Sequence, residues 1–420
     1  MKEINLYQHQ KEFLMQNPDK SALVWSCGTG KTRTAIEWAG KGLEKGFDTH
    51  VLVICPKALK TNWQREAKKW GKDFSIQITS KEEFRKNCNN TLQDKKVIWI
   101  PNHVIVDEVH NGFLTPQFKS QMSKALRNYL KKHNVPRVLL LSATVYTSSP
   151  WNIYNLAYYL GHKWNYRDFS FKFFSQVRMG MRIIPVARKG CEKELAKLTK
   201  KIASVVDIAD CMDVPEQLHC EPEYFALTSE QKKAIKDNYD PVPIVRFTKQ
   251  HEIENGILIG DEFKKSQIYE TDKIERLKTL CEENKKVAIV ARYNSQIDSI
   301  KQKLTEIFGN TIRVIRGDTK DRDRVCVEAE QAEEAIVIIQ SDCGVGFQLP
   351  SFGLCVYVSM SYSYTAWEQM NGRFLRMDKP SRTTFMYLLT DGDSIDQAVF
   401  DSVKKKEDFK IALFAKRNTQ

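Results

Sequence analysis

The chain has 420 residues, and 42% of them are hydrophobic, which is enough for two α/β domains with buried cores at roughly 150 residues per domain. Its 65 Lys and Arg residues against 52 Asp and Glu residues give a formal net charge of +13, which fits a polyanionic partner, although a merely basic protein is the alternative. The ten cysteines are scattered, without a CxxC pair or the Cys/His spacing of a zinc finger, so we expect reduced thiols and no structural metal. The N-terminal sequence lacks an apolar signal region, and no run of about 18 apolar residues occurs, so we expect a cytoplasmic protein without a membrane partner.

Short runs rich in Val and Ile alternate with longer amphipathic segments along the chain. Strands that are buried on both faces of a parallel sheet have such continuous apolar runs. The expected strands are residues 22–25, 51–54, 104–106, 138–141, 287–291, 312–315, 335–339, 354–358 and 384–389. Helices are expected between them, for example over residues 32–40 and 62–70. This alternation predicts an α/β fold with parallel sheets.

The middle of the chain interrupts this rhythm. Residues from about 165 to 245 are basic and aromatic, and segments 169–174 and 192–206 have the pattern of helices that connect or decorate two lobes. A plain helical spacer is the alternative. We therefore predict two tandem parallel-sheet lobes, residues 1–165 and 246–420, joined by a helical, basic connector over 166–245.

The first chemical motif follows the first apolar run. Residues 26–32 read Ser-Cys-Gly-Thr-Gly-Lys-Thr and open a helix. A phosphate needs backbone N–H groups at close range, which a loop containing Gly28, Thr29 and Gly30 can supply, and the helix N-terminus adds partial positive charge. Lys31 should reach the β and γ phosphates of ATP, and the Thr32 hydroxyl should ligate Mg²⁺. The strict pattern has a glycine where this chain has a tryptophan, immediately before residue 26.

Two carboxylates end the apolar run over residues 104–106. Asp107 is placed to join the Mg²⁺ shell and Glu108 to orient the attacking water, which are the two functions that ATP hydrolysis requires. Solvated carboxylates after a strand are the common alternative, and the phosphate loop upstream favours the catalytic interpretation. Residues 142–144, Ser-Ala-Thr, end the run over 138–141 and could either link the nucleotide site to a neighbouring lobe or cap a helix.

A third motif lies near the C-terminus, where residues 369–376 read Gln-Met-Asn-Gly-Arg-Phe-Leu-Arg. Arg373 and Arg376 are three residues apart and share one helical face. A planar guanidinium can stabilise charge on the γ-phosphate in the transition state. Two arginines on a helix are usually only solvated, and the flanking Gln369 at fixed spacing favours the catalytic interpretation. These three side chains complete a predicted catalytic set with Lys31, Asp107 and Glu108.

In this order the segments resemble superfamily 2 helicases, and the resemblance covers nearly the whole chain. It implies two RecA-like lobes that close on ATP and step along DNA. Residues 6–10, Leu-Tyr-Gln-His-Gln, are similar to the family's adenine-reading element, with Gln10 as its glutamine. Gly346, in a segment that resembles the family's fifth motif, is implied to contact the nucleotide.

A finer resemblance is to the Swi/Snf-type branch of double-stranded DNA translocases. It rests on the Asn-Trp pair in residues 56–66, on Asp213-Val214-Pro215, and on segments 227–231, 342–349 and 369–376. The resemblance implies nucleic-acid contacts at Pro56, Lys57, Thr79, Ser80, Arg292, Arg316 and Gly344. Phe347-Gln348 replaces the more usual Leu-Asn of the fifth motif, and the chain lacks the accessory domains of chromatin remodellers. A nucleosome target is therefore not expected.

The function expected from this resemblance is an ATP- and Mg²⁺-dependent DNA helicase or translocase. We expect it to act as a monomer on duplex or branched DNA, at replication forks or recombination intermediates, in the host cytoplasm if a phage encodes it. An RNA helicase and the motor subunit of a restriction system are the alternatives among enzymes. A DNA-binding scaffold with an inactive ATP site is the alternative from another class of protein.

Overall fold

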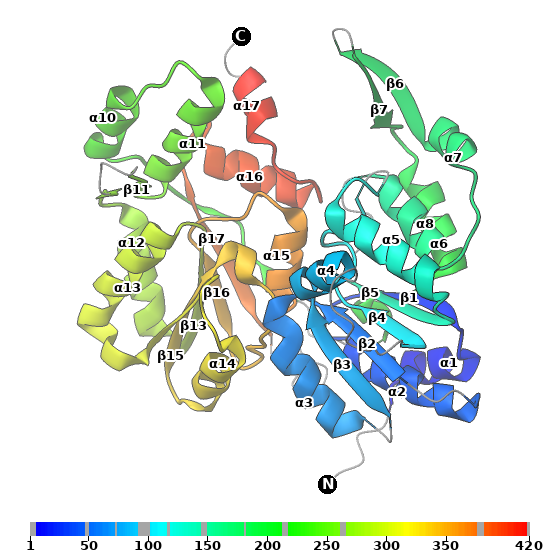
Figure 1. Ribbon diagram of the computed structural model, residues 1–420. Helices are drawn as coiled ribbons and strands as arrows, with labels where there is room; N and C mark the ends of the chain where they lie inside the picture. Colours follow the sequence, from blue (N-terminus) through cyan, green and yellow to red (C-terminus); the bar gives the residue numbers. More distant parts are fainter. Residues whose placement is uncertain are drawn as a thin grey trace. The chain divides into compact units, whose positions relative to one another are not determined.

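Two parallel β-sheets, one in each half of the chain, organise the computed structural model (Figure 1), and the predicted α/β class with two tandem parallel-sheet lobes is confirmed. The structure describes residues 6–46, 50–71, 74–90, 101–115, 118–143, 149–179, 182–211, 217–260, 266–375 and 382–417. By its internal contacts the chain divides into a first unit, residues 1–213, and a second unit, residues 214–420.

The sheet of the first unit has six strands in the order β3-β2-β4-β5-β1-β8, and all neighbouring pairs are parallel. The central strands are apolar runs buried on both faces, which is why the sequence predicts them. The edge strand β3 alternates exposed and half-buried positions over its first four residues, so it has no continuous apolar run from which it could be predicted. The strands span Lys20–Trp25 (β1), His50–Cys55 (β2), Ser75–Ser80 (β3), His103–Val106 (β4), Arg137–Ser142 (β5) and Ser204–Val206 (β8).

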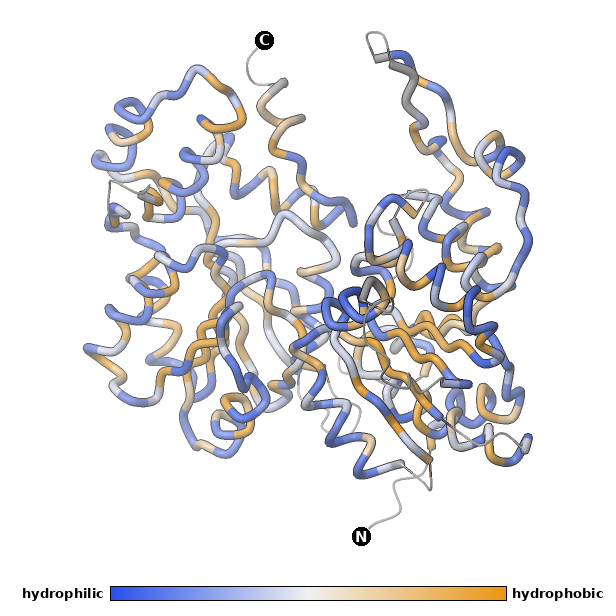
Figure 2. Tube along the Cα trace, viewed as in Figure 1, coloured by the Kyte–Doolittle hydropathy of each residue, from blue (hydrophilic) through white to orange (hydrophobic). Residues whose placement is uncertain are grey.

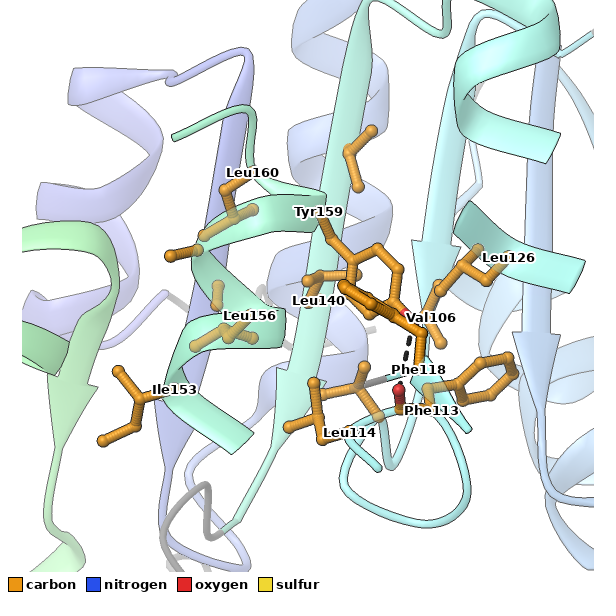
Figure 3. Packing of buried hydrophobic residues seen from close by; sticks show 14 of the residues in the cluster. Val106, Phe113, Leu114, Phe118, Leu126, Leu140, Ile153, Leu156, Tyr159 and Leu160 are labelled. Carbon is orange, nitrogen blue, oxygen red and sulfur yellow. Dashed lines mark hydrogen bonds between the residues drawn. The ribbon is translucent and has the colours of Figure 1, made fainter. Parts of the chain in front are cut away.

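Helices α4, α5, α6, α7 and α8 share one hydrophobic core with this sheet. Figure 3 shows Leu156 and Tyr159 of α6 against Leu140 and Val106 of the sheet, and the Tyr159 hydroxyl donates a hydrogen bond to the Phe113 carbonyl at 3.0 Å. Helix α2 packs against both α1 and α3. The helices span Gln8–Gln16 (α1), Lys31–Glu44 (α2), Lys60–Trp70 (α3), Lys81–Asn90 (α4), Gln121–His133 (α5), Trp151–Tyr159 (α6), Tyr166–Phe173 (α7), Glu192–Ile202 (α8) and Ile208–Cys211 (α9).

The sheet of the second unit has the order β10-β17-β16-β13-β15-β14, with β9 also paired to β17. Successive strand residues alternate between two hydrophobic clusters, so both faces are covered by helices. Figure 2 shows hydrophobic residues along these strands. The strands span Leu218–His219 (β9), Glu223–Phe225 (β10), Lys286–Ala291 (β13), Ile312–Ile315 (β14), Ala335–Gln340 (β15), Leu354–Tyr357 (β16) and Thr384–Thr390 (β17), and a separate pair is formed by Ile257–Leu258 (β11) and Gln267–Ile268 (β12).

One face of this second sheet packs on α12 and α13. The other face packs on α11, α14, α15, α16 and α17. The helices span Ser229–Asp237 (α10), Pro243–Glu254 (α11), Asp272–Glu283 (α12), Asn294–Phe308 (α13), Arg322–Gln331 (α14), Tyr364–Asn371 (α15), Ile395–Lys404 (α16) and Ile411–Arg417 (α17). Among the described residues, no helix combines the length and the apolar character needed to cross a bilayer.

The segment that the sequence analysis assigned to a connector packs in two places. Helices α7 and α8 join the core of the first unit and β8 joins its sheet, whereas β9 and β10 join the sheet of the second. It also contains an antiparallel ribbon, β6 (Phe174–Met179) and β7 (Arg182–Ala187). The helix expected over 192–206 ends at Ile202, because residues 204–206 pair with β1 as β8, and the β-branched Val205 and Val206 favour that strand.

Candidate functional site

The predicted phosphate loop connects β1 to α2. Gly28 and Gly30 have φ angles of 81° and 83°, in the left-handed region that glycine adopts at little cost. Gly30 is the N-cap of α2, and a Cβ atom there would lie 2.5 Å from the Gln10 side-chain nitrogen. Both glycines are therefore required by the backbone, and the loop ends at a helix N-terminus, where backbone N–H groups favour an anion.

The Lys31 ammonium lies inside this loop. Its Nζ donates hydrogen bonds to the carbonyl oxygens of Trp25 at 2.7 Å and Ser26 at 3.0 Å. The Thr29 hydroxyl also donates to the Ser26 carbonyl, at 2.8 Å. An anionic ligand in the loop would exchange these neutral carbonyl partners for charged oxygens, which form stronger hydrogen bonds with an ammonium.

Helix α1 braces the loop from outside. The buried Gln10 amide donates to the Gly30 carbonyl at 3.2 Å and to the Thr34 hydroxyl at 3.0 Å, and its oxygen accepts from the Tyr7 N–H at 2.9 Å. The His9 ring lies 2.9 Å from the Thr29 carbonyl. The structure thus brings Gln10 to the nucleotide loop as expected, but with its polar atoms bonded within the chain. A role in reading adenine stays a prediction.

The two predicted carboxylates lie at the end of β4 and are buried, with Asp107 6% and Glu108 7% exposed. Asp107 accepts hydrogen bonds from the Trp63 indole N–H at 2.8 Å and from the Glu108 N–H at 2.9 Å. Burial, and then the neighbouring Glu108 charge, raise the pKa of Asp107 to about 6, against the lowering effects of the Trp63 hydrogen bond and the Lys31 charge. Strands β1 and β4 both pair in parallel with β5, so the Lys31 loop and the carboxylates lie at the same edge of the sheet.

The surroundings of Glu108 leave negative charge without full compensation. Its backbone is in the left-handed region, at φ 49°, and its Oε2 atom is buried without a hydrogen-bond partner. The His110 ring is 3.5 Å from that oxygen, but burial lowers the His110 pKa to about 4, so the ring is neutral at pH 7. A divalent cation with its water shell would suit this set of buried carboxylate oxygens, because Mg²⁺ prefers such ligands. Asp107 and the Thr32 hydroxyl are the residues that would hold it.

His110 also contacts the next strand end, since its Nδ1 lies 2.8 Å from the Ser142 hydroxyl. Ser142 therefore contacts a residue beside the carboxylate pair, and the predicted link from this segment to the neighbouring lobe stays a prediction. Thr144 lies outside the described residues.

Trp63 is a member of this site that sequence reasoning did not assign to it. In the sequence, the Asn-Trp pair indicates only the resemblance to the DNA-translocase branch. In the structure the Trp63 side chain is 0% exposed and bonds directly to the Asp107 carboxylate. The available signal was a tryptophan in a helix that follows the second strand, but the sequence alone does not show which carboxylate its N–H reaches.

The nucleic-acid contacts predicted in this unit lie at neighbouring strand ends. Pro56 and Lys57 follow β2, Thr79 and Ser80 end β3, and the two strands pair with Cys55 opposite Ser80. Lys57 is exposed in a short 3₁₀ turn, Lys57–Leu59 (η1), whereas Thr79 and Ser80 are buried and hydrogen-bonded to the Glu83 side chain or backbone. The structure brings these residues together, and their contact with nucleic acid stays a prediction.

In the second unit, the predicted segments 342–349 and 369–376 pack together. A Cβ atom on Gly344 would lie 2.9 Å from the Met370 nitrogen, so that loop can approach α15 only with glycine there. Gly346 has a φ of 90°. Gln369 and Arg373 are 8% and 9% exposed, and the Arg373 Nε donates to the Gln369 carbonyl at 2.9 Å. The helical face predicted for the two arginines is wrong for Arg373, because α15 ends at Asn371 and Arg373 lies in the turn that follows. Arg376 lies outside the described residues.

The two other arginines predicted to contact nucleic acid have different surroundings. The Arg292 guanidinium stacks over the Tyr362 ring, 3.9 Å from its centroid. Arg316 pairs with Asp298 at 2.9 Å and with Asp318 at 3.1 Å, and these charges raise its pKa. A phosphate at Arg316 would therefore compete with two carboxylates. Asp213-Val214-Pro215 lies outside the described residues.

Two protein families match the chain, one over the part that contains the phosphate loop and the carboxylate pair and one over the part that contains the arginine segment. Residues 2–147 match the family model described as Type III restriction enzyme, res subunit, and residues 272–378 match the Helicase conserved C-terminal domain. Together the matches take up more than half of the chain and include the phosphate loop, the carboxylate pair and the arginine segment. The chain belongs to the superfamily 2 helicases. The predicted family is thus confirmed, and its members use ATP.

Two individual proteins are also similar to the chain. YwqA of Bacillus subtilis (strain 168), named as a candidate ATP-dependent helicase/translocase, is 20% identical over 467 aligned residues, which cover 97% of this chain and 48% of that protein. The chain therefore spans about half the length of this curated relative. A solved structure, the Sulfolobus solfataricus SWI2/SNF2 ATPase core in complex with dsDNA, matches with a TM-score of 0.43 and 16% identity, covering 98% of this chain and 92% of that one.

Proposed function

We propose that this chain hydrolyses ATP with Mg²⁺ to move along duplex or branched DNA. The observation that carries the proposal is the buried Asp107–Glu108 pair beside the Lys31 loop. Such a desolvated, incompletely compensated pair is costly to keep and is typical of a catalytic site. A scaffold protein with an inactive ATP site would have no use for it.

Each residue of the first unit has a proposed task. The loop N–H groups from Gly28 to Gly30 and the Lys31 ammonium hold the phosphates, and Thr32 with Asp107 holds Mg²⁺. Bound Mg²⁺ would spread phosphate charge and make the γ-phosphate a better target. Glu108, whose buried Oε2 atom accepts no hydrogen bond from the described residues, orients the attacking water and accepts its proton.

The second unit would supply the positive charge that the transition state needs. We propose that Arg373 and Arg376 act on the γ-phosphate as arginine fingers when the lobes close, with Gln369 and Gly346 beside them. Arg373 is held by the Gln369 carbonyl at 2.9 Å, so its guanidinium is partly preorganised. Preorganised donors of this kind stabilise a transition state without reorganising during the reaction.

The proposal that the motor uses DNA rests on the Swi/Snf-type motifs and on the charge of the middle segment. Residues 169–191 include five Lys or Arg residues and no Asp or Glu. They include the C-terminal part of α7, after Asp168, and the strands β6 and β7, where Val177 and Val186 are 41% and 45% exposed. A basic two-stranded ribbon with exposed apolar residues fits a nucleic-acid groove. The contacts at Pro56, Lys57, Thr79, Ser80, Arg292, Arg316 and Gly344 are proposed on the same grounds.

A second candidate, the motor subunit of a restriction system, is favoured by the description of the family model that matches residues 2–147. Such a motor receives its sequence specificity from a partner chain. The isolated chain would then need that partner for DNA to stimulate its ATPase, whereas a fork- or junction-processing motor acting as a monomer would not. Light scattering with and without DNA reports its oligomeric state.

The test is the steady-state ATPase rate of the isolated chain with single strands, duplex, forks, four-way junctions and RNA. We expect duplex and branched DNA to stimulate turnover, with branched DNA at least as effective, and we expect stimulation to be independent of sequence because phosphate contacts carry no base information. Stimulation by RNA alone, with duplex and junction DNA inert, would overturn the DNA assignment. An ATPase that does not respond to any nucleic acid would overturn the motor itself.

A further inference from the structure

Trp63 is the one residue that α3 buries, and it reaches the nucleotide site. Its side chain is 0% exposed, and the indole N–H donates to the Asp107 Oδ2 atom at 2.8 Å. A tryptophan N–H in a protein interior needs an acceptor, and here the acceptor is a proposed metal ligand rather than a backbone carbonyl.

The hydrogen bonds of Asp107 fix the plane of its carboxylate. One oxygen accepts from the Trp63 indole and the other accepts from the Glu108 N–H at 2.9 Å. The two donors come from different parts of the fold, so rotation of the carboxylate would break at least one bond. Donors of this kind orient metal ligands, and their removal typically costs 10–100-fold in metal affinity or activity.

The helix that carries Trp63 is also tied to the segments proposed to contact nucleic acid. The turn η1, which starts at the exposed Lys57, leads directly into α3. Lys60 in the first turn of α3 pairs with Glu83 at 2.8 Å, and Glu83 accepts from the Ser80 N–H at 2.9 Å. Both proposed contact segments are therefore connected to Trp63 through short, directly bonded elements.

We propose that Trp63 is a positioning residue for Asp107, and that its hydrogen bond transmits nucleic-acid binding at η1 and β3 to the metal ligand. When a nucleic-acid backbone is bound at η1 and β3, α3 holds the indole N–H against Asp107. Without bound nucleic acid, α3 is less restrained, and the Asp107 carboxylate is less well oriented to ligate Mg²⁺. The relay rests on the proposed function, because it assumes that DNA stimulates ATP hydrolysis.

The chain offers a matched control. Trp38 in α2 is also 0% exposed, and its indole N–H donates at 2.8 Å, but to the Pro18 carbonyl. Trp63→Phe and Trp38→Phe each remove one buried indole N–H and the same ring volume. Only the first removes a donor from a carboxylate of the nucleotide site.

Two readouts test the proposal. The first is the affinity for a fluorescent ATP analogue, N-methylanthraniloyl-ATP, with Mg²⁺ and with EDTA. The second is the ATPase kcat and KM with and without duplex DNA. We expect Trp63→Phe to weaken Mg²⁺-dependent nucleotide binding by roughly 10–100-fold, to leave binding in EDTA unchanged, and to lose most of the DNA stimulation of kcat while DNA binding persists. Trp38→Phe should match the wild type in both.

If Trp63→Phe matches Trp38→Phe in both readouts, the positioning role is wrong. Loss of Mg²⁺-dependent binding with full DNA stimulation would keep the positioning role and overturn the relay. A wild-type chain that DNA fails to stimulate would instead contradict the proposed function, so the two failures are distinguishable. If Trp63→Phe folds poorly, site-specific replacement of Trp63 by β-(3-benzothienyl)alanine, which keeps the bicyclic shape without the N–H, should give the same two losses.

Discussion

Asp107 in the first unit and Asp396 in the second are both almost fully buried, at 6% and 3% exposed, and the structure compensates their charges in opposite ways. Among the described residues, the hydrogen-bond donors to Asp107 are neutral N–H groups, and it lies beside another carboxylate, so burial and Glu108 raise its pKa. Asp396 bonds Lys273 at 2.5 Å and the His251 ring at 3.0 Å. Burial alone would raise the pKa of Asp396, but these two partners bring it below its ordinary value.

The comparison separates a scaffold from a reactive site. Asp396 also accepts from the Asn255 amide at 2.8 Å and the Thr390 hydroxyl at 2.9 Å, so both of its oxygens are hydrogen-bonded and the network joins α11, α12, β17 and α16. Burial, and then the Asp396 charge, raise the pKa of the buried Glu254 beside it to about 7. Buried charge that is fully paired in this way fixes an arrangement of elements. Asp107 and Glu108 retain a deficit of positive charge that a bound cation would remove, and groups of that kind gather at functional sites.

The largest expected effect is on catalysis. Asp107→Asn should lower ATP turnover on the order of 10³-fold, because it removes a charged metal ligand. It should change the free energy of unfolding without Mg²⁺ by no more than about 1 kcal/mol, since loss of repulsion with Glu108 offsets a weakened Trp63 hydrogen bond. Calorimetry and ATPase assays measure the two effects. A variant that unfolds readily would place Asp107 among the scaffold residues and break the comparison.

Asp396→Asn should show the reverse pattern. Removing one partner of a buried ion pair leaves Lys273 charged and uncompensated, which costs about 3–5 kcal/mol of unfolding free energy. Calorimetry should show this loss in the second unit, with nucleotide binding by the first unit retained. The double variant Lys273→Met/Asp396→Leu should recover most of the stability, because no unpaired charge remains. If Asp396→Asn is as stable as the wild type, the network does not hold the fold.

His251 gives the comparison a pH dependence. Burial lowers its pKa against the raising effect of Asp396, so the ring is neutral in the folded state at neutral pH. A depressed histidine pKa contributes stability that is present above the unfolded value of about 6.5 and is lost as pH falls below it. His251→Gln should therefore be less stable than wild type at pH 7.5, and the gap should narrow by up to about 1.4 kcal/mol per pH unit below pH 6.5. A gap that widens on acidification would reverse the assigned sign.

The smallest expected effect is at the exposed Lys57, outside both buried networks. Lys57→Ala should weaken DNA binding about equally for all sequences and reduce the slope of log affinity against log salt by about 1, since one phosphate contact is lost. Stability should not change measurably. Fluorescence anisotropy with several duplexes and salt concentrations is the measurement, and a loss restricted to one sequence would argue against a phosphate contact.

Much of the first unit could be predicted from local sequence. The buried strands are continuous apolar runs, and the phosphate loop and the carboxylate pair each lie within a few consecutive residues. The edge strand β3 and the short strand β8 contain too few consecutive apolar residues to be predicted as buried strands. The sequence predicts a single connector over residues 166–245, because its basic and aromatic composition does not indicate that its two ends join different sheets.

The contacts between distant residues were not predictable. Trp63 precedes Asp107 by 44 residues, and Lys273 and His251 precede Asp396 by 123 and 145 residues. No periodicity or spacing pairs such residues, because only the tertiary fold brings their side chains together. A lysine, a histidine and an aspartate in an otherwise ordinary helix pattern look like solvated surface residues.

The central claim is that the buried carboxylate pair hydrolyses ATP, and the most direct measurement compares Glu108→Gln with the wild type. Nucleotide affinity and single-turnover hydrolysis are measured on both, with Mg²⁺ and duplex DNA. We predict that Glu108→Gln binds ATP with nearly the wild-type affinity and hydrolyses it about 10²–10⁴-fold more slowly, because the group that orients the water and accepts its proton is gone. Turnover by Glu108→Gln at the wild-type rate would contradict the account.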